Sequence, residues 1–185
     1  MRVVAGTFKG QRLVAPKRAS TRPTADRVRE ALFSMLAPVD GELVLDLYAG
    51  SGALGIEALS RGATRATLVD SDIAATAAMG QNIDRLGIEQ ARVVRADVGA
   101  FLKKAARRGE RWSLVFCDPP YRLAHRLGRE LEARLPPILA EGARIVCESS
   151  TKQPLQLGLP LVTERRYGDT LICIYRCNAG TGGRD

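Results

Sequence analysis

The stretch DLYAGSGALGIEAL, residues 46–59, places three glycines in a G-x-G-x-x-G spacing where an apolar run gives way to a helical pattern. Glycines at such a strand-to-helix turn let the backbone approach a ligand and leave the N–H groups of the helix start free to bind it. The spacing alone is a weak signal, because it suits several nucleotide-like ligands. The stretch therefore predicts a nucleotide-type pocket at the end of a strand without identifying its occupant.

Asp46 distinguishes between two possible occupants. It lies four residues before Gly50, the first of the glycines, at the end of the predicted strand. A carboxylate there would repel the pyrophosphate of a dinucleotide such as NAD, whereas it would attract a cation. S-adenosylmethionine carries a sulfonium and an α-ammonium group. The sequence therefore favours S-adenosylmethionine over NAD as the cofactor.

Two further acids end the next two strands. Asp70 ends the run ATLVD about 20 residues beyond the glycines, where an acid accepts hydrogen bonds from ribose hydroxyls. Asp97 can accept from the adenine amino group while the Val98 N–H serves a ring nitrogen, and a plain helix N-cap is the alternative role for Asp97. Asp72 is interpreted as the N-cap of the next helix. The predicted cofactor-binding residues are Asp46, Tyr48, Ala49, Gly50, Ser51, Gly52, Asp70, Ser71, Asp97, Val98 and Asp118.

Short apolar runs alternate with helical patterns along the rest of the chain after Gly41. This alternation predicts an α/β fold whose parallel strands are buried on both faces. The last two runs are joined by Gly168-Asp169, a hairpin signal, so the sheet should end in an antiparallel pair. The predicted strands are LVLDLY, ATLVD, ARVVRAD, SLVFCD, ARIVCESS, PLVTERRY and TLICIYRC.

The run VFCDPPYR, residues 115–122, sets an acid, two prolines and an aromatic ring at the end of the fourth strand. Proline fixes φ and donates no hydrogen bond, so the turn is stiff and its carbonyls remain available as acceptors. An exocyclic base amine is a poor nucleophile, and acceptors that orient it and stabilise its growing positive charge favour methyl transfer to it. An aromatic ring can stack on the base. The predicted catalytic residues are Asp118, Pro119, Pro120 and Tyr121.

The carboxylate of Asp118 also discriminates among the bases. An ionised carboxylate only accepts hydrogen bonds, and guanine offers adjacent N1–H and N2–H donors. Adenine pairs an amino donor with a ring acceptor and fits less well, while cytosine N4 stays open on this argument. Methylation of cytosine C5 is disfavoured, because it needs a cysteine nucleophile and Cys117 should point away from the face of Asp118. Guanine N2 is therefore the predicted target.

The N-terminal 36 residues carry most of the net charge. They hold eight Lys and Arg against Asp26 and Glu30, which gives +6 of the chain's +8. Such a basic block indicates a polyanionic partner, with nucleic acid favoured and a solvated surface as the alternative. A second cluster, KKAARRGER at 103–111, is interpreted as an exposed helix face. The predicted RNA-binding residues are Arg2, Lys9, Arg12, Lys17, Arg18, Arg22, Thr24 and Arg27.

Three pieces should make up this basic block. The runs RVVAG and QRLVA predict a small β-hairpin, the stretch PKRASTRPT resists regular structure, and a helix begins at a Thr24 N-cap and ends before Pro38. We therefore expect a basic N-terminal extension over residues 1–38 and a catalytic core over residues 39–177. The tail, residues 178–185, has nothing to bury and is expected to be disordered.

Four stretches in this order resemble the RsmD family of bacterial 16S ribosomal RNA guanine-N2 methyltransferases over about residues 1–177: RVVAGTFKGQRL, STRPTADRVREALF, DLYAGSGALGIEALSRGA and DPPY. The resemblance implies a seven-stranded, Rossmann-like class I methyltransferase fold. It also implies S-adenosylmethionine as the donor, S-adenosylhomocysteine as the product, and an enzyme of the 16S rRNA (guanine(966)-N2)-methyltransferase type. Its partner would be the 16S RNA of a partly assembled small ribosomal subunit.

The resemblance assigns roles only to matching positions. The loop from Asp46 to Gly52, together with Asp70 and Asp97, would hold the cofactor, and residues 118–121 the target base. Arg22, Pro23 and Thr24 match a family loop next to the active site. The chain departs from the family at Asp70, where glutamate is frequent, and has tyrosine at 48 and 121 where phenylalanine is common. These changes preserve hydrogen-bond acceptance and stacking.

Composition limits the alternatives. The four cysteines form no paired C-x-x-C spacing, so we expect buried free thiols and no metal site. No apolar run approaches the roughly 18 residues of a membrane span, and a cytoplasmic monomer is expected. A DNA amino-methyltransferase and a non-catalytic RNA-binding or assembly module are the rival functions. An NAD-dependent oxidoreductase is disfavoured by Asp46 and by the lone His125.

Overall fold

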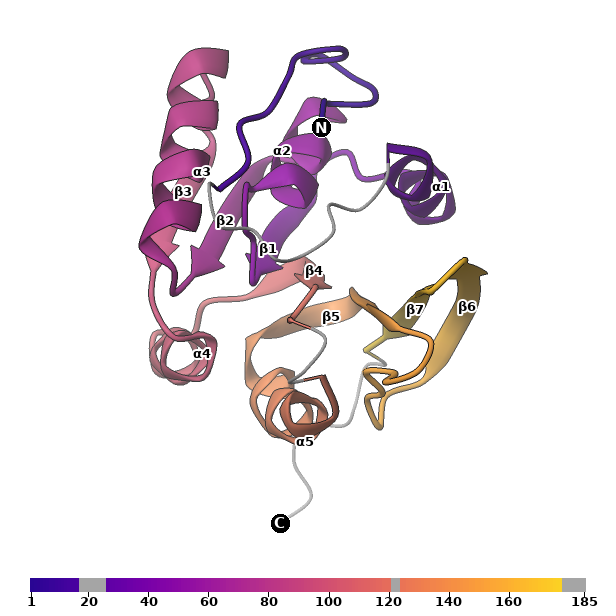
Figure 1. The fold of residues 1–185 in the computed structure, drawn as a ribbon. Helices are drawn as coiled ribbons and strands as arrows, with labels where there is room; N and C mark the ends of the chain where they lie inside the picture. Colours follow the sequence, from indigo (N-terminus) through magenta and orange to yellow (C-terminus); the bar gives the residue numbers. More distant parts are fainter. Residues whose placement is uncertain (17–25, 121–123, 178–185) are drawn as a thin grey trace. The chain divides into compact units, whose positions relative to one another are not determined.

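The computed structural model describes residues 1–16, 26–120 and 124–177, and the chain divides into two compact units, residues 1–97 (unit 1) and residues 98–185 (unit 2) (Figure 1). The whole of the predicted basic extension belongs to unit 1, so the boundary expected at residue 38 does not coincide with this division and stays a prediction. Five predicted site residues and the predicted tail lie outside the described residues: Lys17, Arg18, Arg22, Thr24, Tyr121 and residues 178–185.

Unit 1 contains three parallel strands in the order β3-β2-β1. Nearly every residue of β1 and β2 is buried, as expected for strands covered on both faces. The same expectation is wrong for β3, where Arg92 and Arg95 are exposed, because β3 is the edge strand. The elements of unit 1 are α1 (Asp26–Leu36), β1 (Leu43–Leu47), α2 (Ala53–Ser60), β2 (Arg65–Asp70), α3 (Ile73–Leu86) and β3 (Ala91–Arg95).

Unit 2 places β4 parallel to β5, and β7 antiparallel to both β5 and β6. The predicted hairpin turn is confirmed at Gly168, whose φ of 61 is the left-handed conformation that glycine adopts without penalty. Helix α4 packs on β4 through Phe101 and Trp112, whose ring centroids are 5.9 Å apart. The elements are α4 (Val98–Arg107), β4 (Trp112–Cys117), α5 (Ala124–Arg134), the 3-10 helix η2 (Pro136–Ile138), β5 (Leu139–Ser150), β6 (Leu161–Tyr167) and β7 (Thr170–Arg176).

Together the units hold the seven strands of a mixed sheet, ordered β3-β2-β1 in unit 1 and β4-β5-β7-β6 in unit 2. The antiparallel final pair and the strand–helix alternation confirm the predicted α/β, Rossmann-like fold class. Over the residues with described placement, no helix is both long and apolar enough to cross a membrane.

Residues 1–14 form a reduced version of the predicted hairpin. The pairing consists of one bridge between Arg2 and Arg12, flanked by hydrogen bonds of 2.9 Å from the Val3 N–H to the Gln11 carbonyl and from the Gly10 N–H to the Val3 carbonyl. Figure 1 shows this segment beside α2 and α3. Several of its other backbone groups bind side chains of these two helices, as described below, which leaves little of the segment for a strand ladder.

Candidate active site

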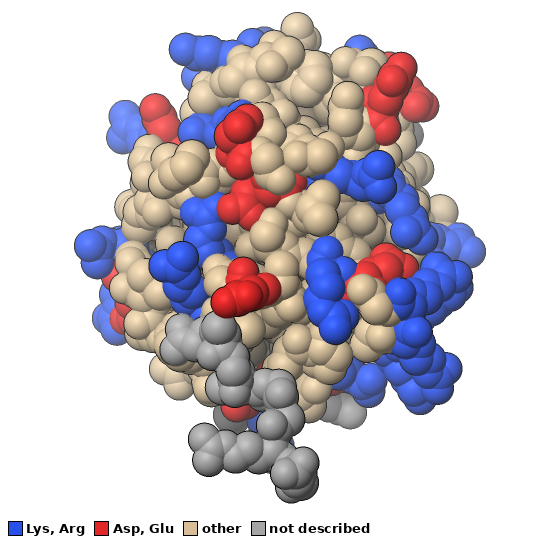
Figure 2. All heavy atoms as spheres, turned by 180° about the vertical axis from the view of Figure 1, so that it is seen from behind, with Lys and Arg blue, Asp and Glu red and all other residues tan. Residues whose placement is uncertain are grey.

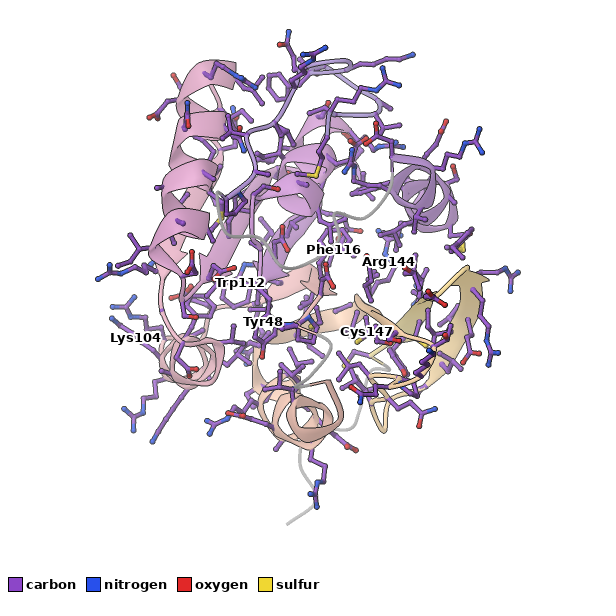
Figure 3. All side chains as sticks on the ribbon, in the orientation of Figure 1. Tyr48, Lys104, Trp112, Phe116, Arg144 and Cys147 are labelled. Carbon is purple, nitrogen blue, oxygen red and sulfur yellow. The ribbon has the colours of Figure 1, made fainter. Side chains whose placement is uncertain are left out.

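The backbone between β1 and α2 takes a left-handed path at Tyr48 (φ 60), Gly50 (φ 56) and Gly52 (φ 78). Positive φ is an outlier for a bulky residue such as Tyr48, labelled in Figure 3, and such outliers concentrate at functional sites. Gly52 is the N-cap of α2 and supplies no capping side chain. The start of α2 therefore lacks a side-chain cap, an arrangement that suits an anionic group such as a carboxylate.

The third glycine of the motif has a packing role. The Gly55 N–H donates to a carboxylate oxygen of Asp46 at 2.9 Å, and a Cβ built on Gly55 would lie 2.2 Å from the Leu68 Cδ2 atom. Leu68 is fully buried on β2, so it has little room to move. Gly55 thus sets the close approach of α2 to the sheet and keeps the Asp46 carboxylate hydrogen-bonded.

Gly55→Ala should destabilise the protein by about 1–3 kcal/mol, because overpacking at Leu68 outweighs the gain in helix propensity. Gly80→Ala is the matched control, since Gly80 is also helical in unit 1 but a Cβ built on it would meet nothing within 4 Å. That control should be neutral or stabilising by about 0.5–1 kcal/mol. Urea unfolding of both variants measures the difference, and equal stabilities would show that the packing at Gly55 is not tight.

Asp46 carries a buried carboxylate near the carboxyl end of β1. Its side chain is 1% exposed, and this burial raises the pKa of Asp46 to about 7, against the opposing effect of the Gly55 hydrogen bond and with a smaller increase from the charge of Asp70. A carboxylate with this pKa is only partly ionised near neutral pH. A cation bound beside it would favour the ionised form, so the site is suited to a positively charged ligand.

Asp70, at the end of β2, is hydrogen-bonded to the glycine loop. One of its oxygens accepts from the Gly50 N–H and the other from the Asp72 N–H, both at 2.9 Å. A carboxylate has about four acceptor positions, so these two bonds leave it able to accept from ligand hydroxyls as well. Asp72 accepts from the Ala75 N–H at 2.8 Å, which confirms it as the N-cap of α3, and Ser71 between the two acids is exposed.

Asp97 follows β3 as an exposed residue directly before α4. Val98 is the first residue of α4 and is buried. The position agrees with both roles considered for Asp97, a ligand contact and a helix N-cap. The acids of β1, β2 and β3 therefore all occur at or just after the carboxyl end of their strand, where α/β folds bind ligands.

The acid, Pro, Pro segment of unit 2 follows β4. Asp118 is half-buried, Pro119 is buried and Pro120 is exposed. Since Asp118 and Pro119 each precede a proline, both are restricted to extended backbone, which limits the directions open to the Asp118 side chain. Cys117, the last residue of β4, is buried and pairs in register with Cys147 on β5. Both cysteines are free thiols, as is the buried Cys173 on β7, in agreement with the expected buried thiols. Cys177 is also free but only half-buried, so the expected burial is wrong for this residue.

The described basic residues of the predicted RNA-binding set lie on the surface. Arg2, Lys9, Arg12 and Arg27 are all exposed. The second cluster is exposed as predicted over Lys103, Lys104 and Arg107 of α4, but the helix ends at Arg107, so the prediction of a helix face is wrong for residues 108–111. Figure 3 shows Lys104 projecting from α4, and Figure 2 shows Lys and Arg side chains on the surface. Within the part of the chain that the structure describes, no group of three or more His, Cys, Asp or Glu is placed to hold a metal ion.

A buried charged network under residues 1–14 was not predicted from the sequence. Glu57 on α2 is fully buried and accepts from the Val4 N–H at 2.7 Å and the Ala5 N–H at 3.0 Å. Its carboxylate also pairs with Arg61 at 2.8 Å and with Arg29 at 3.7 Å. The position of Glu57 among apolar neighbours in a short helix is the one signal in the sequence, and it does not identify the partners.

Arg29 completes this network from α1. It is fully buried, pairs with Asp26 at 3.0 Å and donates to the Arg2 carbonyl. Arg29 therefore contributes to the net charge of the N-terminal block but not to its surface. Within the N-terminal block, the buried Arg29 helps to hold residues 1–14 against α1 and α2. Other cations of the block, such as Lys9 and Arg12, are exposed to solvent.

Comparisons with known proteins identify the family of the chain. A model of the family described as conserved hypothetical protein 95 matches residues 1–176. YlbH of Bacillus subtilis, which carries the name of an rRNA methyltransferase, is 39% identical over 186 residues, 95% of this chain and 98% of YlbH. Ribosomal RNA small subunit methyltransferase D of Escherichia coli K12 is 45% identical over 124 residues, which are 66% of this chain and 61% of that protein.

Two solved structures share the fold over nearly the whole chain. The E. coli protein yhhF, named as a methyltransferase, matches with a TM-score of 0.82 at 37% identity, covering 97% of this chain and 99% of its own. A hypothetical protein of Thermus thermophilus matches with a TM-score of 0.83 at 35% identity, covering 96% of this chain and 99% of its own. The fold and the sequence motifs therefore point to the same group of proteins.

Proposed function

The chain belongs to the family described as conserved hypothetical protein 95, as an RsmD-type protein, and we propose that it transfers a methyl group from S-adenosylmethionine to N2 of a guanine in 16S ribosomal RNA. The names of its relatives support methylation of ribosomal RNA. One structural observation carries the choice of cofactor: the buried carboxylate of Asp46 beside the start of α2, which has no side-chain cap. This pairing suits a ligand that has both a cationic centre and a carboxylate.

Most of the residues proposed to bind the cofactor belong to unit 1. The N–H groups of Gly50 and Gly52 already donate to Asp70 and to the Ala49 carbonyl, so the Ser51 N–H and the first turn of α2 bind the methionine carboxylate. Asp46 stabilises the ammonium and sulfonium charges through the surrounding low dielectric. Asp70, already bonded to the Gly50 N–H, accepts from the ribose hydroxyls next to Ser71. Asp97 accepts from the adenine amino group, and the Val98 N–H serves a ring nitrogen. The loop residues Tyr48, Ala49 and Ser51 shape this pocket.

Cofactor affinity should rise with pH through about 7. In the free protein burial raises the pKa of Asp46 to about 7, and a bound cation lowers it, so binding favours the ionised carboxylate. Below pH 7 the affinity for S-adenosylmethionine should fall by up to about tenfold per pH unit, and above about pH 8 it should level off. Titration calorimetry from about pH 5.5 to about pH 8.5 measures this, with Asp46→Asn as the comparison. A wild-type profile as flat as that of the Asn variant would contradict the assigned role.

In the catalytic half, the Asp118 carboxylate and the Pro119 carbonyl accept hydrogen bonds from the target amine. Bound S-adenosylmethionine would supply a methyl group on a positively charged sulfur, which would leave as the neutral thioether of S-adenosylhomocysteine as guanine N2 takes the methyl group. N2 would then lose its extra proton to water. Asp118 stabilises the positive charge on N2 while it develops, and Tyr121 and Pro120 border the base.

Guanine is preferred because of the donor pattern that Asp118 reads. An ionised carboxylate can accept from N1–H and N2–H of guanine together, which fixes the base in one orientation. The RNA is bound through cations and one hydroxyl side chain of the N-terminal block, and the 16S RNA of a small-subunit precursor is the proposed partner. The residues proposed for this role are Arg2, Lys9, Arg12, Lys17, Arg18, Arg22, Thr24 and Arg27.

Neutralising Lys9 and Arg12 together should weaken RNA binding and flatten its salt dependence, by roughly 0.7 in logarithmic slope for each phosphate interaction removed. The double variant Lys152→Ala, Arg165→Ala removes the same charges from exposed positions in unit 2 and is the matched control. Filter binding of a 16S RNA transcript from about 50 to about 300 mM salt gives the slopes. If both double variants change the slope equally, the N-terminal segment makes no special phosphate contact.

The activity is tested with labelled S-adenosylmethionine and three substrates: a 16S RNA transcript, partly assembled small-subunit particles and duplex DNA. Nuclease digestion followed by mass spectrometry should identify N2-methylguanosine from RNA or particles, and no product from DNA. Label in adenosine, cytidine or DNA would overturn the proposed specificity. Absence of label in every substrate would favour a non-catalytic RNA-binding protein.

A further inference from the structure

Asn82 is a buried polar residue in the middle of α3 that has no place in the mechanism above. Its side chain is fully buried. Burial of an amide side chain costs free energy unless its donors and its acceptor are hydrogen-bonded. The hydrogen-bond partners of Asn82 therefore indicate its role. Those partners come from two segments distant in sequence, residue 14 at the end of the N-terminal segment and residue 51 in the glycine loop.

Both N–H donors of the Asn82 amide are used in these contacts. Its carbonyl oxygen accepts from the Val14 N–H at 2.8 Å, while its NH₂ group donates to the Val14 carbonyl at 3.0 Å and to the Ser51 carbonyl at 3.0 Å. The paired bonds to Val14 imitate a strand pairing and hold the segment just before Lys17 and Arg18. An amide can donate to two carbonyls while accepting from one N–H, which accounts for asparagine at this position.

Ser51 is contacted by the N-terminal segment a second time. Its hydroxyl lies 3.9 Å from the Met1 sulfur, in hydrogen-bonding geometry, and its side chain is largely buried. The two ends of the segment, Met1 and Val14, are thus both connected to one residue of the glycine loop, Met1 directly and Val14 through Asn82. A shift of the loop would disturb the segment, and a shift of the segment would disturb the loop.

We propose that Asn82 is a positioning residue that couples the two substrates: cofactor bound at the glycine loop strengthens RNA binding by the N-terminal segment, and RNA strengthens cofactor binding by the same factor. This inference rests on the proposed function. The equality of the two effects is a thermodynamic requirement for any coupling between two sites. The consequence is that RNA is held most tightly by protein that already carries cofactor.

The test measures a ratio, because a purely structural role would lower both affinities and leave their ratio unchanged. The affinity of the wild-type protein for a 16S RNA transcript is determined with and without saturating S-adenosylhomocysteine. We expect at least about fivefold tighter RNA binding with the cofactor product, the lower end of typical coupling between sites. Asn82→Ala should reduce the factor to near one.

Ser60→Ala is the matched control. Ser60 on α2 also holds the N-terminal segment, since its hydroxyl accepts from the Phe8 N–H at 2.9 Å and donates to the Ala5 carbonyl, and neither of these bonds involves the glycine loop. It should weaken RNA binding while retaining the wild-type coupling factor. Asn82→Asp is the second test variant, in case the alanine variant does not fold: it keeps the acceptor for the Val14 N–H and loses both donors, so coupling should again be lost.

Hydrogen exchange gives an independent readout. Addition of S-adenosylhomocysteine should slow exchange of the Val14 amide in wild type and in Ser60→Ala, but not in the Asn82 variants. A wild-type protein that binds both partners without coupling, or Asn82 variants that keep the wild-type factor, would overturn this inference and leave the proposed function intact. A wild-type protein that binds neither partner would overturn both.

Discussion

Asp118→Ala should reduce methyl transfer by at least about 10²–10³-fold, the usual loss when one preorganised electrostatic contact to a transition state is removed. The half-buried carboxylate follows β4 and precedes two consecutive prolines, whose stiff backbone prevents the turn from adjusting to its loss. Cofactor affinity should change little, because Asp118 is one of eleven predicted cofactor contacts and most of the others belong to unit 1. The expected signature is a fall in the rate of the chemical step at nearly unchanged affinity for S-adenosylmethionine.

Two comparisons separate this role from general damage. Asp169→Ala removes an exposed acid from the β6–β7 turn of the same unit and should leave the rate unchanged. Asp118→Asn keeps the size of the side chain but turns an NH₂ group toward the guanine donors, so it should be nearly as impaired as the alanine variant. Single-turnover kinetics measure the chemical step. A rate for Asp118→Ala within a few-fold of wild type would refute the role.

Glu57→Ala should destabilise the protein by about 3–5 kcal/mol, the range for breaking a buried ion pair by removal of one partner. Glu57 is fully buried and serves Arg29, Arg61 and the N–H groups of Val4 and Ala5. Its loss removes one of the two carboxylates that pair with the buried Arg29 guanidinium and leaves two backbone donors without their acceptor. Since domains of this kind are stable by about 5–15 kcal/mol in total, such a loss is severe.

Urea denaturation followed by fluorescence and circular dichroism measures this effect, with Glu89→Ala as the matched control at an exposed position of unit 1. The control should differ from wild type by less than about 0.5 kcal/mol. The double variant Arg29→Met, Glu57→Leu should recover only part of the loss, because it removes the unpaired charge but not the need for an acceptor at Val4 and Ala5. Equal midpoints for Glu57→Ala and the control would show that the network is dispensable.

The features that the sequence predicted are those set by local chemistry. The hairpin turn at Gly168 and the Asp72 cap each depend on a few adjacent residues, and the structure confirms both. The positions of Asp46 and Asp70 near the ends of β1 and β2 could be predicted because each short apolar run has an acid at or next to its last residue. The packing role of Gly55 was not predicted, although the third glycine of such a motif commonly serves helix–strand contact.

The features that the sequence did not predict depend on long-range contacts. Glu57 and Asn82 are separated from their backbone partners by at least 31 residues, so nothing nearby marks them as buried anchors. Arg29 belongs by sequence to a basic block, although its helix face is otherwise apolar and it is fully buried. The exposure of β3 likewise depends on its place at the edge, which the pattern of apolar residues does not reveal. The pKa of Asp46 follows from burial and could only be obtained from the structure.

We propose that this protein methylates N2 of a guanine in 16S ribosomal RNA, and the modified nucleosides of cells that lack the protein test this proposal. Small-subunit RNA from cells that lack the protein is digested, and its modified nucleosides are mapped by mass spectrometry beside RNA from wild-type cells. We predict the loss of one N2-methylguanosine, restored by the wild-type gene but not by the Asp118→Ala variant. An unchanged set of methylated guanosines in the deleted cells would contradict the account.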